Sequence, residues 1–401
     1  MNSRIHLAVV LIFLLGKIGT TSAQSSYDIV KVSQAETSYN TVTATVYQVN
    51  GKSYVYSGGD GNQVDVFRLD DKLQLKKLKS YVVAGGKKTV RGIVADKVHG
   101  QDFLFVGLKG GHAVEVYKIG DDGLLTSVFV VEDTDSTYLG VVITLQVIHM
   151  ASDTYLFVGG LEKSPGMTSF KILPNGHLEH IQSMGDTQDM FMDGIIGMAI
   201  HHKADKTYLY TGGFHDNGLS SFRVYEDGRF ENVDNFGDDH TRFMNGTYPV
   251  ISTSIQGRDF VITGHRHHIY YKPTNWIKDK DSYYYHGDAV SVFIVNDEGK
   301  LMPRSVFIDN TETLIQGQTR LHKLPIDDQN DLIAVATRDD QSVQLFVLND
   351  KGRLIDAGKI KTGFPIYYGL AGAQINEKAI LIAGSVEGNE LACYRLDMRQ
   401  N

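Results

Sequence analysis

Histidines and aromatic residues gather in one stretch, "GHRHHIYYKPTNWIKDKDSYYYHGD", which runs from Gly264 to Asp288. Histidine is the commonest metal-binding side chain, and a carboxylate can complete a coordination shell. If the two ends of the stretch meet, they bring together the candidate ligands of a divalent metal ion: His265, His267, His286 and Asp288. The stretch has no CxxC pattern and no i, i+4 histidine pair, so its spacing names no particular metal.

The aromatic residues of the same stretch support a second interpretation, a recognition loop or lid. Tyrosine and tryptophan offer large rigid contact surfaces with one polar tip. The residues expected to contact a ligand from this stretch are Tyr271, Trp276 and Tyr284. A third interpretation is an ordinary surface hairpin, because loops tolerate insertions. Only the place of the stretch in the fold separates these interpretations.

Familiar catalytic patterns are absent from the sequence. It contains no GxSxG, HExxH, P-loop or EF-hand pattern. The segment "HLEH" at 177–180 sets a histidine and a glutamate on one face of a strand, as an exposed outer strand also would. Apart from the divalent metal ion considered above, the sequence implies no cofactor.

The N-terminus has the pattern of a secretory signal peptide over residues 1–23. Arg4 supplies the positive start, Leu7 to Leu15 form a short apolar run, and Thr21-Ser22-Ala23 is a small-residue cleavage site. That run is too short to span a bilayer, and no other segment approaches the roughly 18 apolar residues a span needs. We expect a secreted, extracellular chain without a membrane span, folded as one domain over residues 24–401.

Charge and cysteine content narrow the class of protein. Asp and Glu number 47 against 39 Lys and Arg, which gives a net charge of −8 and argues against nucleic acid or anionic membranes as partners. The single cysteine, Cys393, lies in the apolar segment "LACYRL" and is expected to be buried. Without a disulfide, stability must come from a large core.

A repeated unit organises the chain. Apolar runs that end in a small residue recur roughly every fifty residues: "YVYSG", "FLFVG", "YLFVG", "YLYTG", "FVITG", "LIAVA" and "ILIAG". A polar turn and a second strand follow each run, and Asp-Gly or Asn-Gly hairpin turns follow several of these. No stretch has a sustained helical period. Seven units of four antiparallel strands are typical of an all-β, seven-bladed β-propeller.

The chain ends predict how the ring closes. The last unit stops at "CYRLDMRQN", one strand short, whereas "YDIVKVS", Tyr27 to Ser33, is an extra strand before the first unit. We expect this N-terminal strand to complete the last blade as its outermost strand, which removes the open sheet edges. One interval exceeds the others by about twenty residues, so the aromatic stretch is an insert at about 269–287 in blade five.

The units "FLFVGLKGGHAVEVYKIGDDGLL" and "YLYTGGFHDNGLSSFRVYEDGRFENVDNFGDD" resemble the lactonase-like, YVTN-type propeller repeats. They are also similar to tandem repeats in large secreted bacterial proteins. The resemblance covers the whole mature chain and implies a seven-bladed propeller. It further implies one of two roles, since some members hydrolyse a sugar lactone and many are binding or scaffold proteins. A lactonase catalytic set does not match here residue by residue.

One face of the ring carries the predicted site. Loops from strand two to strand three, and from strand four to the next blade, share a face with one mouth of the central channel. An Xaa-Gly pair stands at the start of most innermost strands, where glycine allows close approach at the axis. The predicted ligand-binding ring is Arg91, Asp193, Asn245, Gln316 and Tyr368. Alternatively, these side chains satisfy backbone groups between blades or hold channel water.

Asn245-Gly246-Thr247 is an N-glycosylation sequon on the same face, and a glycan there would cap the mouth. We expect a secreted, monomeric binding or interaction protein whose ring and insert contact an extracellular small molecule or protein. The alternative is a lactone or ester hydrolase, in which Arg91 stabilises negative charge and Asp193 or a histidine activates water. A structural component of an extracellular matrix or of secretion is the third class.

Overall fold

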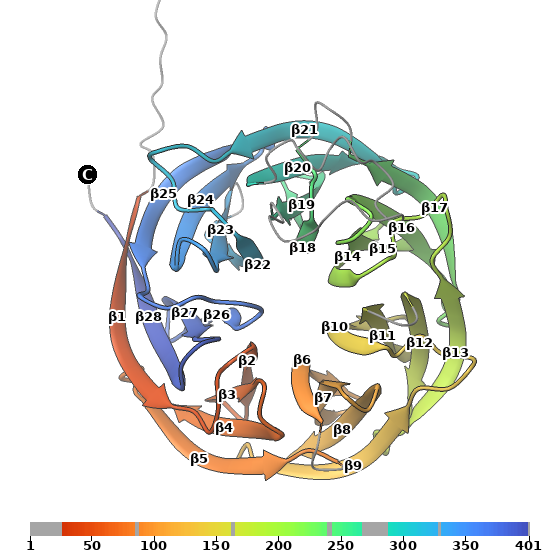
Figure 1. Ribbon diagram of the computed structural model, residues 1–401, viewed down its shortest axis with the longest axis horizontal. Coiled ribbons are helices and arrows are strands. Elements are labelled where there is room, and N and C mark those ends of the chain that lie inside the picture. Colours follow the sequence, from red (N-terminus) through yellow and green to blue (C-terminus); the bar gives the residue numbers. More distant parts are fainter. Residues whose placement is uncertain are drawn as a thin grey trace, which may run out of the picture.

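The computed structural model describes residues 26–84, 88–161, 165–238, 243–266, 288–327 and 330–399. In these residues seven sheets of four antiparallel strands form a ring around a central axis, and no helix interrupts them (Figure 1). The expected all-β, seven-bladed propeller is confirmed. Within the same residues no helix is long and apolar enough to cross a membrane.

Each blade is numbered along the chain, with its strands given from the axis outward. Blades one to three comprise β2 (Thr43–Val49), β3 (Lys52–Gly58), β4 (Gln63–Leu69) and β5 (Leu75–Val82); β6 (Thr89–Val98), β7 (Gln101–Lys109), β8 (Ala113–Ile119) and β9 (Leu125–Glu132); β10 (Val141–His149), β11 (Thr154–Leu161), β12 (Gly166–Ile172) and β13 (Leu178–Gly185). Blades four and five comprise β14 (Ile195–Lys203), β15 (Lys206–Gly213), β16 (Gly218–Val224) and β17 (Phe230–Gly237); β18 (Thr247–Ile255), β19 (Arg258–His265), β20 (Ala289–Val295) and β21 (Leu301–Ile308). Blades six and seven comprise β22 (Gln318–Pro325), β23 (Asn330–Thr337), β24 (Ser342–Asn349) and β25 (Leu354–Lys361); β26 (Leu370–Ile375), β27 (Lys378–Gly384), β28 (Glu390–Met398) and β1 (Tyr27–Glu36).

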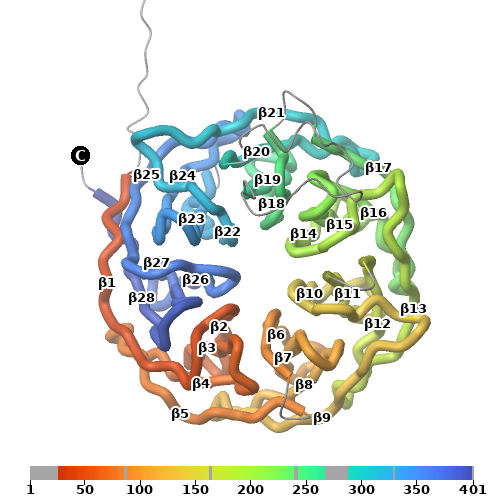
Figure 2. The backbone as a smooth tube through the Cα atoms, viewed as in Figure 1, coloured from red at the N-terminus to blue at the C-terminus, as the bar shows by residue number. Residues whose placement is uncertain are grey.

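The N-terminal strand closes the ring as the sequence predicts. β1 pairs antiparallel with β28 from Tyr27 opposite Met398 to Glu36 opposite Glu390, and it is the outermost strand of blade seven. Figure 2 shows the red N-terminal strand beside the blue C-terminal one. Just beyond the strands, the Arg399 N–H donates to the Ser26 carbonyl at 2.8 Å.

Neighbouring blades interlock through the aromatic residues of the repeated runs and the turn glycines. Tyr56 donates its hydroxyl to the carbonyl of Gly123 in the next blade at 3.0 Å. Gly123 has a φ of 75°, and a Cβ there would lie 2.3 Å from the Tyr54 ring. Glycine is therefore required twice over at this turn, by its backbone conformation and by the ring packed against it. This contact explains why the aromatic run and the turn glycine recur together in the sequence.

The innermost strands are irregular where they begin near the axis. One residue is bulged out of the pairing between the first two strands in blades two, three, four and six: Arg91, Ile143, Ile196 and Thr319. In blade five the skipped residues are Tyr248 and Pro249. A β-bulge re-aims the side chain that it displaces. Five blades thus turn at least one residue out of their ladders at the same end of the inner strands.

Candidate functional site

Two sets of equivalent residues surround the channel mouth. The axial ring consists of the residues that precede the first regular inner-strand pair: Val42, Arg91, Ile143, Ile196, Tyr248, Thr319 and Tyr368. The rim ring consists of the residues two positions after the small residue that ends each repeated run: Asp60, Lys109, Leu161, Phe214, Arg266, Arg338 and Val386. Most of the axial ring is buried and apolar, and it packs as one cluster with Phe214. Charge is concentrated in the rim ring.

A cavity of about 360 Å³ opens between these rings, and we call it the axial cavity. Its lining residues come from blades one, two, three, six and seven: Val42, Asp60, Arg91, Lys109, Val141, Ile143, Leu161, Arg338, Tyr367, Tyr368, Val386 and Glu387. Apolar walls with a few convergent polar groups are typical of small-molecule sites, whose volumes run from about 300 to 1,000 Å³. The axial cavity therefore fits a compact ligand.

Two oppositely charged side chains in the axial cavity, Arg91 and Asp60, neutralise each other. Arg91 forms an ion pair with Asp60, and the Asn40 amide donates to the same carboxylate at 2.7 Å. Burial works to raise the pKa of Asp60, but the hydrogen bonds from Asn40 and Arg91 prevail and lower it. Asp60 is therefore ionised at neutral pH, and it offsets the charge of Arg91.

Two tyrosines of the axial ring form a hydrogen-bonded pair. The Tyr248 and Tyr368 hydroxyl oxygens lie 2.6 Å apart, and their rings stack at 5.6 Å with an angle of 10°. Burial raises the pKa of both hydroxyls, so both remain protonated at physiological pH. Two hydroxyls carry two hydrogens, and their mutual bond uses one of them. The pair thus retains one O–H that can donate to a ligand.

Two arginines of the rim ring lie against the ring of Tyr367. The guanidinium carbons of Arg266 and Arg338 are each 5.5 Å from its centroid, and that of Arg266 is also 5.8 Å from the Tyr248 centroid. Such cation–π contacts orient a guanidinium without neutralising it. Arg266 is only 4% exposed, so a full positive charge is buried beside the axial cavity.

The structure brings together two members of the ring predicted from sequence, Arg91 and Tyr368, which both line the axial cavity. Asp193 instead accepts a hydrogen bond from His215 at 3.0 Å, and its amide bonds to the Asp216 carboxylate. Asn245 is 2% exposed, and Gln316 is exposed with its N–H bonded to Asp340. None of these three lines the axial cavity.

The predicted ring residues separate in this way because the Xaa-Gly pairs are of two structural kinds. Gly92 lies opposite Gly107 in the ladder, so Arg91 belongs to the axial ring. The other kind comprises Gly194, Gly246 and Gly317, which have φ values of 77°, 61° and 69° and accept hydrogen bonds from the N–H groups of Phe214, Arg266 and Arg338. These glycines serve a left-handed turn that holds the rim ring, a few residues before the axial position.

Sequence reasoning missed the basic residues of the rim ring, Lys109, Arg266 and Arg338. The sequence nevertheless marks their position in the repeat, because each stands two residues after the small residue that ends a repeated run. The seven residues at this position share no residue type. A search for a repeated motif therefore passes over them, whereas a comparison of equivalent positions across the units would have found them.

The predicted metal ligands fall partly within the described residues. His265 is fully buried; its Nε2 lies 2.9 Å from the Ser291 hydroxyl and its Nδ1 lies 3.4 Å from that of Thr247. Burial lowers the pKa of His265 to about 3, so the ring is neutral. Asp288 accepts a hydrogen bond from the Gly317 N–H at 3.0 Å. No group of three or more potential ligands occurs in the described part of the chain.

The remaining predicted residues lie outside the described ranges: His267, His286, Tyr271, Trp276, Tyr284 and the signal peptide at 1–23. The residues that flank the insert, Arg266 and Asp288, are described, and both lie at the mouth face. Arg266 donates its N–H to Gly246, and Asp288 binds Gly317. Glycosylation of Asn245 stays a prediction, and in the folded chain its side chain is buried.

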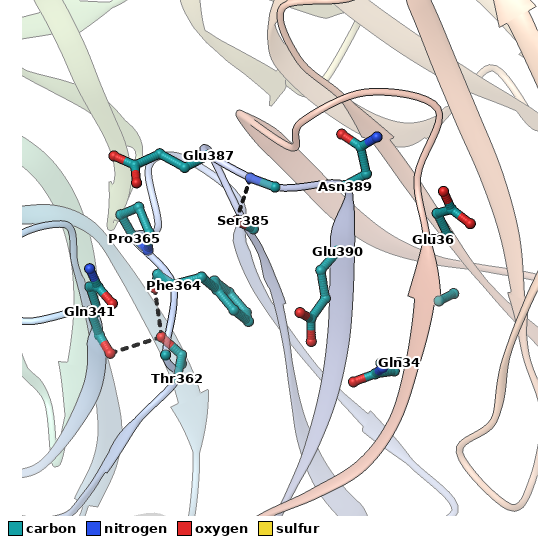
Figure 3. Close-up of a pocket in the computed structure, with 13 residues that line it drawn as sticks. Gln34, Glu36, Gln341, Thr362, Phe364, Pro365, Ser385, Glu387, Asn389 and Glu390 are labelled. Atoms are coloured by element: carbon teal, nitrogen blue, oxygen red, sulfur yellow. Dashed lines mark hydrogen bonds between the residues drawn. The ribbon is translucent and has the colours of Figure 1, made fainter.

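A second cavity, of about 670 Å³, lies where β1 closes blade seven against blade six, and we call it the seam groove (Figure 3). Its charged lining residues are all acidic: Glu36, Glu387 and Glu390. Glu390 is already paired with Lys31 at 2.5 Å. Although the seam groove is larger, its lining residues come from one junction between two blades, whereas five blades line the axial cavity. Glu387 lines both cavities.

Solved structures share this fold, although no family model and no curated sequence matches the chain. Raptor from Chaetomium thermophilum aligns with a TM-score of 0.60 at 12% identity, over 94% of this chain and 29% of the Raptor chain. A protein from Lactobacillus plantarum aligns with a TM-score of 0.56 at 13% identity, over 86% of this chain and 98% of that one. At such identities the likeness shows the propeller fold alone, and the chain spans less than a third of Raptor.

Proposed function

We propose that the protein is an extracellular binding protein that takes its ligand in the axial cavity. The observation that carries this proposal is the convergence of five blades on one cavity lined by three basic side chains and two tyrosines. The three basic side chains and Tyr368 come from positions that are equivalent from blade to blade, at or beside the ends of the inner strands. A preorganised concave site of this kind suits binding.

Hydrolysis of a lactone or ester is the less favoured function. That alternative required Asp193 or a histidine to act with Arg91 on one substrate, yet neither Asp193 nor any histidine is among the described residues that line the cavity containing Arg91. The carboxylate nearest to Arg91 is Asp60, which is ionised and held by two donors. A general base needs a lone pair within reach of the attacking water and a pKa near the working pH. Asp60 lacks the second property.

Secretion and the aromatic insert complete the proposal. The signal peptide predicted at 1–23 would deliver the chain, as a monomer, to the outside of the cell. Since the insert leaves and rejoins the ring at the mouth face, its tyrosines and Trp276 are proposed to add contacts for an extracellular ligand. A chain recovered from culture medium with Gln24 as its first residue would support this delivery, and retention in the cytosol would contradict it.

A cavity-filling variant tests the site. Val386→Trp places a large side chain in the axial cavity, and Val82→Trp, at a 58% exposed position on β5, is the matched control. Both proteins and the wild type are screened against a panel of small charged and uncharged metabolites by thermal shift. We expect compounds that stabilise the wild type and the control but not Val386→Trp. A panel in which every stabilising compound acts equally on all three proteins would overturn the axial site.

The insert is tested separately by deleting residues 271–285. If the insert contributes contacts, the deletion weakens binding of the compounds found above and leaves the melting temperature nearly unchanged. If the melting temperature instead falls together with binding, the insert has a structural role.

A further inference from the structure

The axial cavity holds more positive charge than its own carboxylates neutralise. Beyond the pair formed by Arg91 and Asp60, Arg338 lines the cavity and the buried Arg266 lies beside it, against one further carboxylate in the lining, Glu387. Arg91 and Asp60 cancel each other as an ion pair. Positive charge in a concave site attracts anions and raises their local concentration. The net charge of the whole chain is −8, so this local excess of positive charge runs against the average of the protein.

Arg266 and Arg338 have aromatic neighbours where ion-pair partners would be expected. Within the described residues no carboxylate lies at ion-pair distance from either guanidinium. Asp339 attracts Arg266, but from beyond that distance. A buried guanidinium has five N–H donors and normally pairs with a carboxylate or phosphate. The Tyr367 ring orients both arginines. The side chain of Arg266 also hydrogen-bonds to Tyr248 and Tyr367, whereas no hydrogen bond of the Arg338 guanidinium occurs within the described residues.

Other donors near the tyrosine pair also lack acceptors. The hydroxyls of Tyr248 and Tyr368 keep one O–H beyond their mutual bond. Arg320, at the start of β22, lies within electrostatic range of Tyr368, and its buried Nε–H has no partner in the described part of the chain. Buried donors are nearly always bonded to an acceptor. An oxyanion carries negative charge and accepts several hydrogen bonds. A site with spare hydrogen-bond donors and a positive electrostatic potential is therefore suited to bind one.

We propose that the axial cavity binds the oxyanion group, carboxylate or phosphate, of a compact organic molecule. The Arg338 guanidinium and the free O–H of the tyrosine pair donate to the oxygens, and Arg266 is a positioning residue that fixes Tyr367 and adds to the field. The uncharged part of the ligand packs on Val42, Ile143 and Leu161. This inference rests on the proposed function, since it names the ligand class of the same site.

Calorimetry at constant ionic strength tests the ligand class, because exposed charges respond to salt. The probes are inorganic phosphate, glycerol 3-phosphate and malonate, with glycerol as the uncharged comparison. We expect the wild type to bind at least one anionic probe and not glycerol. Arg338→Met should weaken that binding about tenfold or more, as loss of a charge-assisted hydrogen bond does. The comparison of the phosphate and malonate arms identifies which oxyanion is preferred.

Charge variants of opposite sign sharpen the test. Glu387→Gln removes a negative charge from the cavity wall and should tighten anion binding severalfold, whereas Arg229→Met, at a 69% exposed hairpin tip, should leave it unchanged. Arg266→Lys keeps the charge but loses the planar stacking, and it should weaken binding even if Arg266→Met fails to fold. Equal binding by wild type and Arg338→Met, or no binding of any anionic probe, would overturn the inference. If uncharged compounds still discriminate Val386→Trp, the proposed function survives that result.

Discussion

The axial cavity and the seam groove share Glu387 but arise in different ways. The axial cavity is built from equivalent positions in five blades, whereas the seam groove exists only where the two ends of the chain meet. Its acidic lining matches the overall charge of the protein, and the basic lining of the axial cavity opposes it. A lining whose charge is opposite to the net charge of the protein is not explained by overall composition and points to a local role. The comparison therefore supports the proposal that a ligand binds at the axis, whereas the seam closes the ring.

Removal of β1 should reduce thermal stability more than any other change considered below, because it breaks the pairing that closes the ring at blade seven. A chain that begins at Thr37 loses every pair of the β1–β28 ladder and exposes the edge of β28. We expect its melting temperature to fall by about 10 °C or more, or cooperative unfolding to be lost, relative to a chain that begins at Ser26. Circular dichroism during heating measures this difference. Equal melting temperatures would mean that the seam does not stabilise the ring.

Acid should destabilise the axial side through His265. Its pKa of about 3 in the folded protein lies below its ordinary value of about 6.5, so the unfolded chain takes up the proton first. Stability is fully present above about pH 6.5 and falls, by up to about 1.4 kcal/mol for each pH unit, as the pH decreases toward 3. Urea unfolding between pH 7 and 4 measures the slope. His265→Gln should flatten the slope; an unchanged slope would contradict the assignment.

The Tyr248–Tyr368 pair should stabilise the mouth by about 1 kcal/mol. Tyr248→Phe and Tyr368→Phe each remove one partner of a buried hydrogen bond, and the double variant removes both. Because an unpaired buried hydroxyl is costly, the double variant should lose less stability than the sum of the two single losses. Urea unfolding of all four proteins gives the coupling energy. Strict additivity would show that the hydroxyls do not interact.

The Lys31–Glu390 ion pair at the seam should contribute least to the free energy of unfolding. Its side chains are 38% and 34% exposed, and an ion pair in water adds between 0 and about 1 kcal/mol. Lys31→Met should therefore change stability by less than about 1 kcal/mol, and it should leave anion binding at the axis unaltered. A larger loss would indicate that the seam depends on this pair as well as on its backbone ladder.

The repeat and its closure were predictable because they depend on local patterns. Small residues such as Gly107 and Gly159 end apolar runs at a regular interval, and the missing strand at one end matched the extra strand at the other. These features follow from strand pairing and packing between blades, which act the same way in every unit. The expected strand at Tyr27 to Ser33 was correct and extends to Glu36.

The site was less predictable because it depends on differences between the units. Arg91 was found from its Gly92 neighbour, but Asp193 shares that pattern for another reason, the left-handed turn at Gly194. Arg338 and Arg266 follow runs whose final residues differ, and they have no motif of their own. Bulges at the start of the inner strands decide which side chain reaches the axis. A one-residue bulge leaves no clear mark in a single sequence.

The position of the two chain ends determines how the protein responds to tension. Tyr27 and Met398 form the first pair of an antiparallel ladder, and Ser26 and Arg399 lie beside each other just beyond it. Force applied to Ser26 and Arg399 therefore breaks the hydrogen bonds of this first pair before those of the next, so that the ladder separates one pair at a time. A strand that is peeled opposes less force than one whose bonds are sheared together. A molecule tethered at both ends would open at blade seven first.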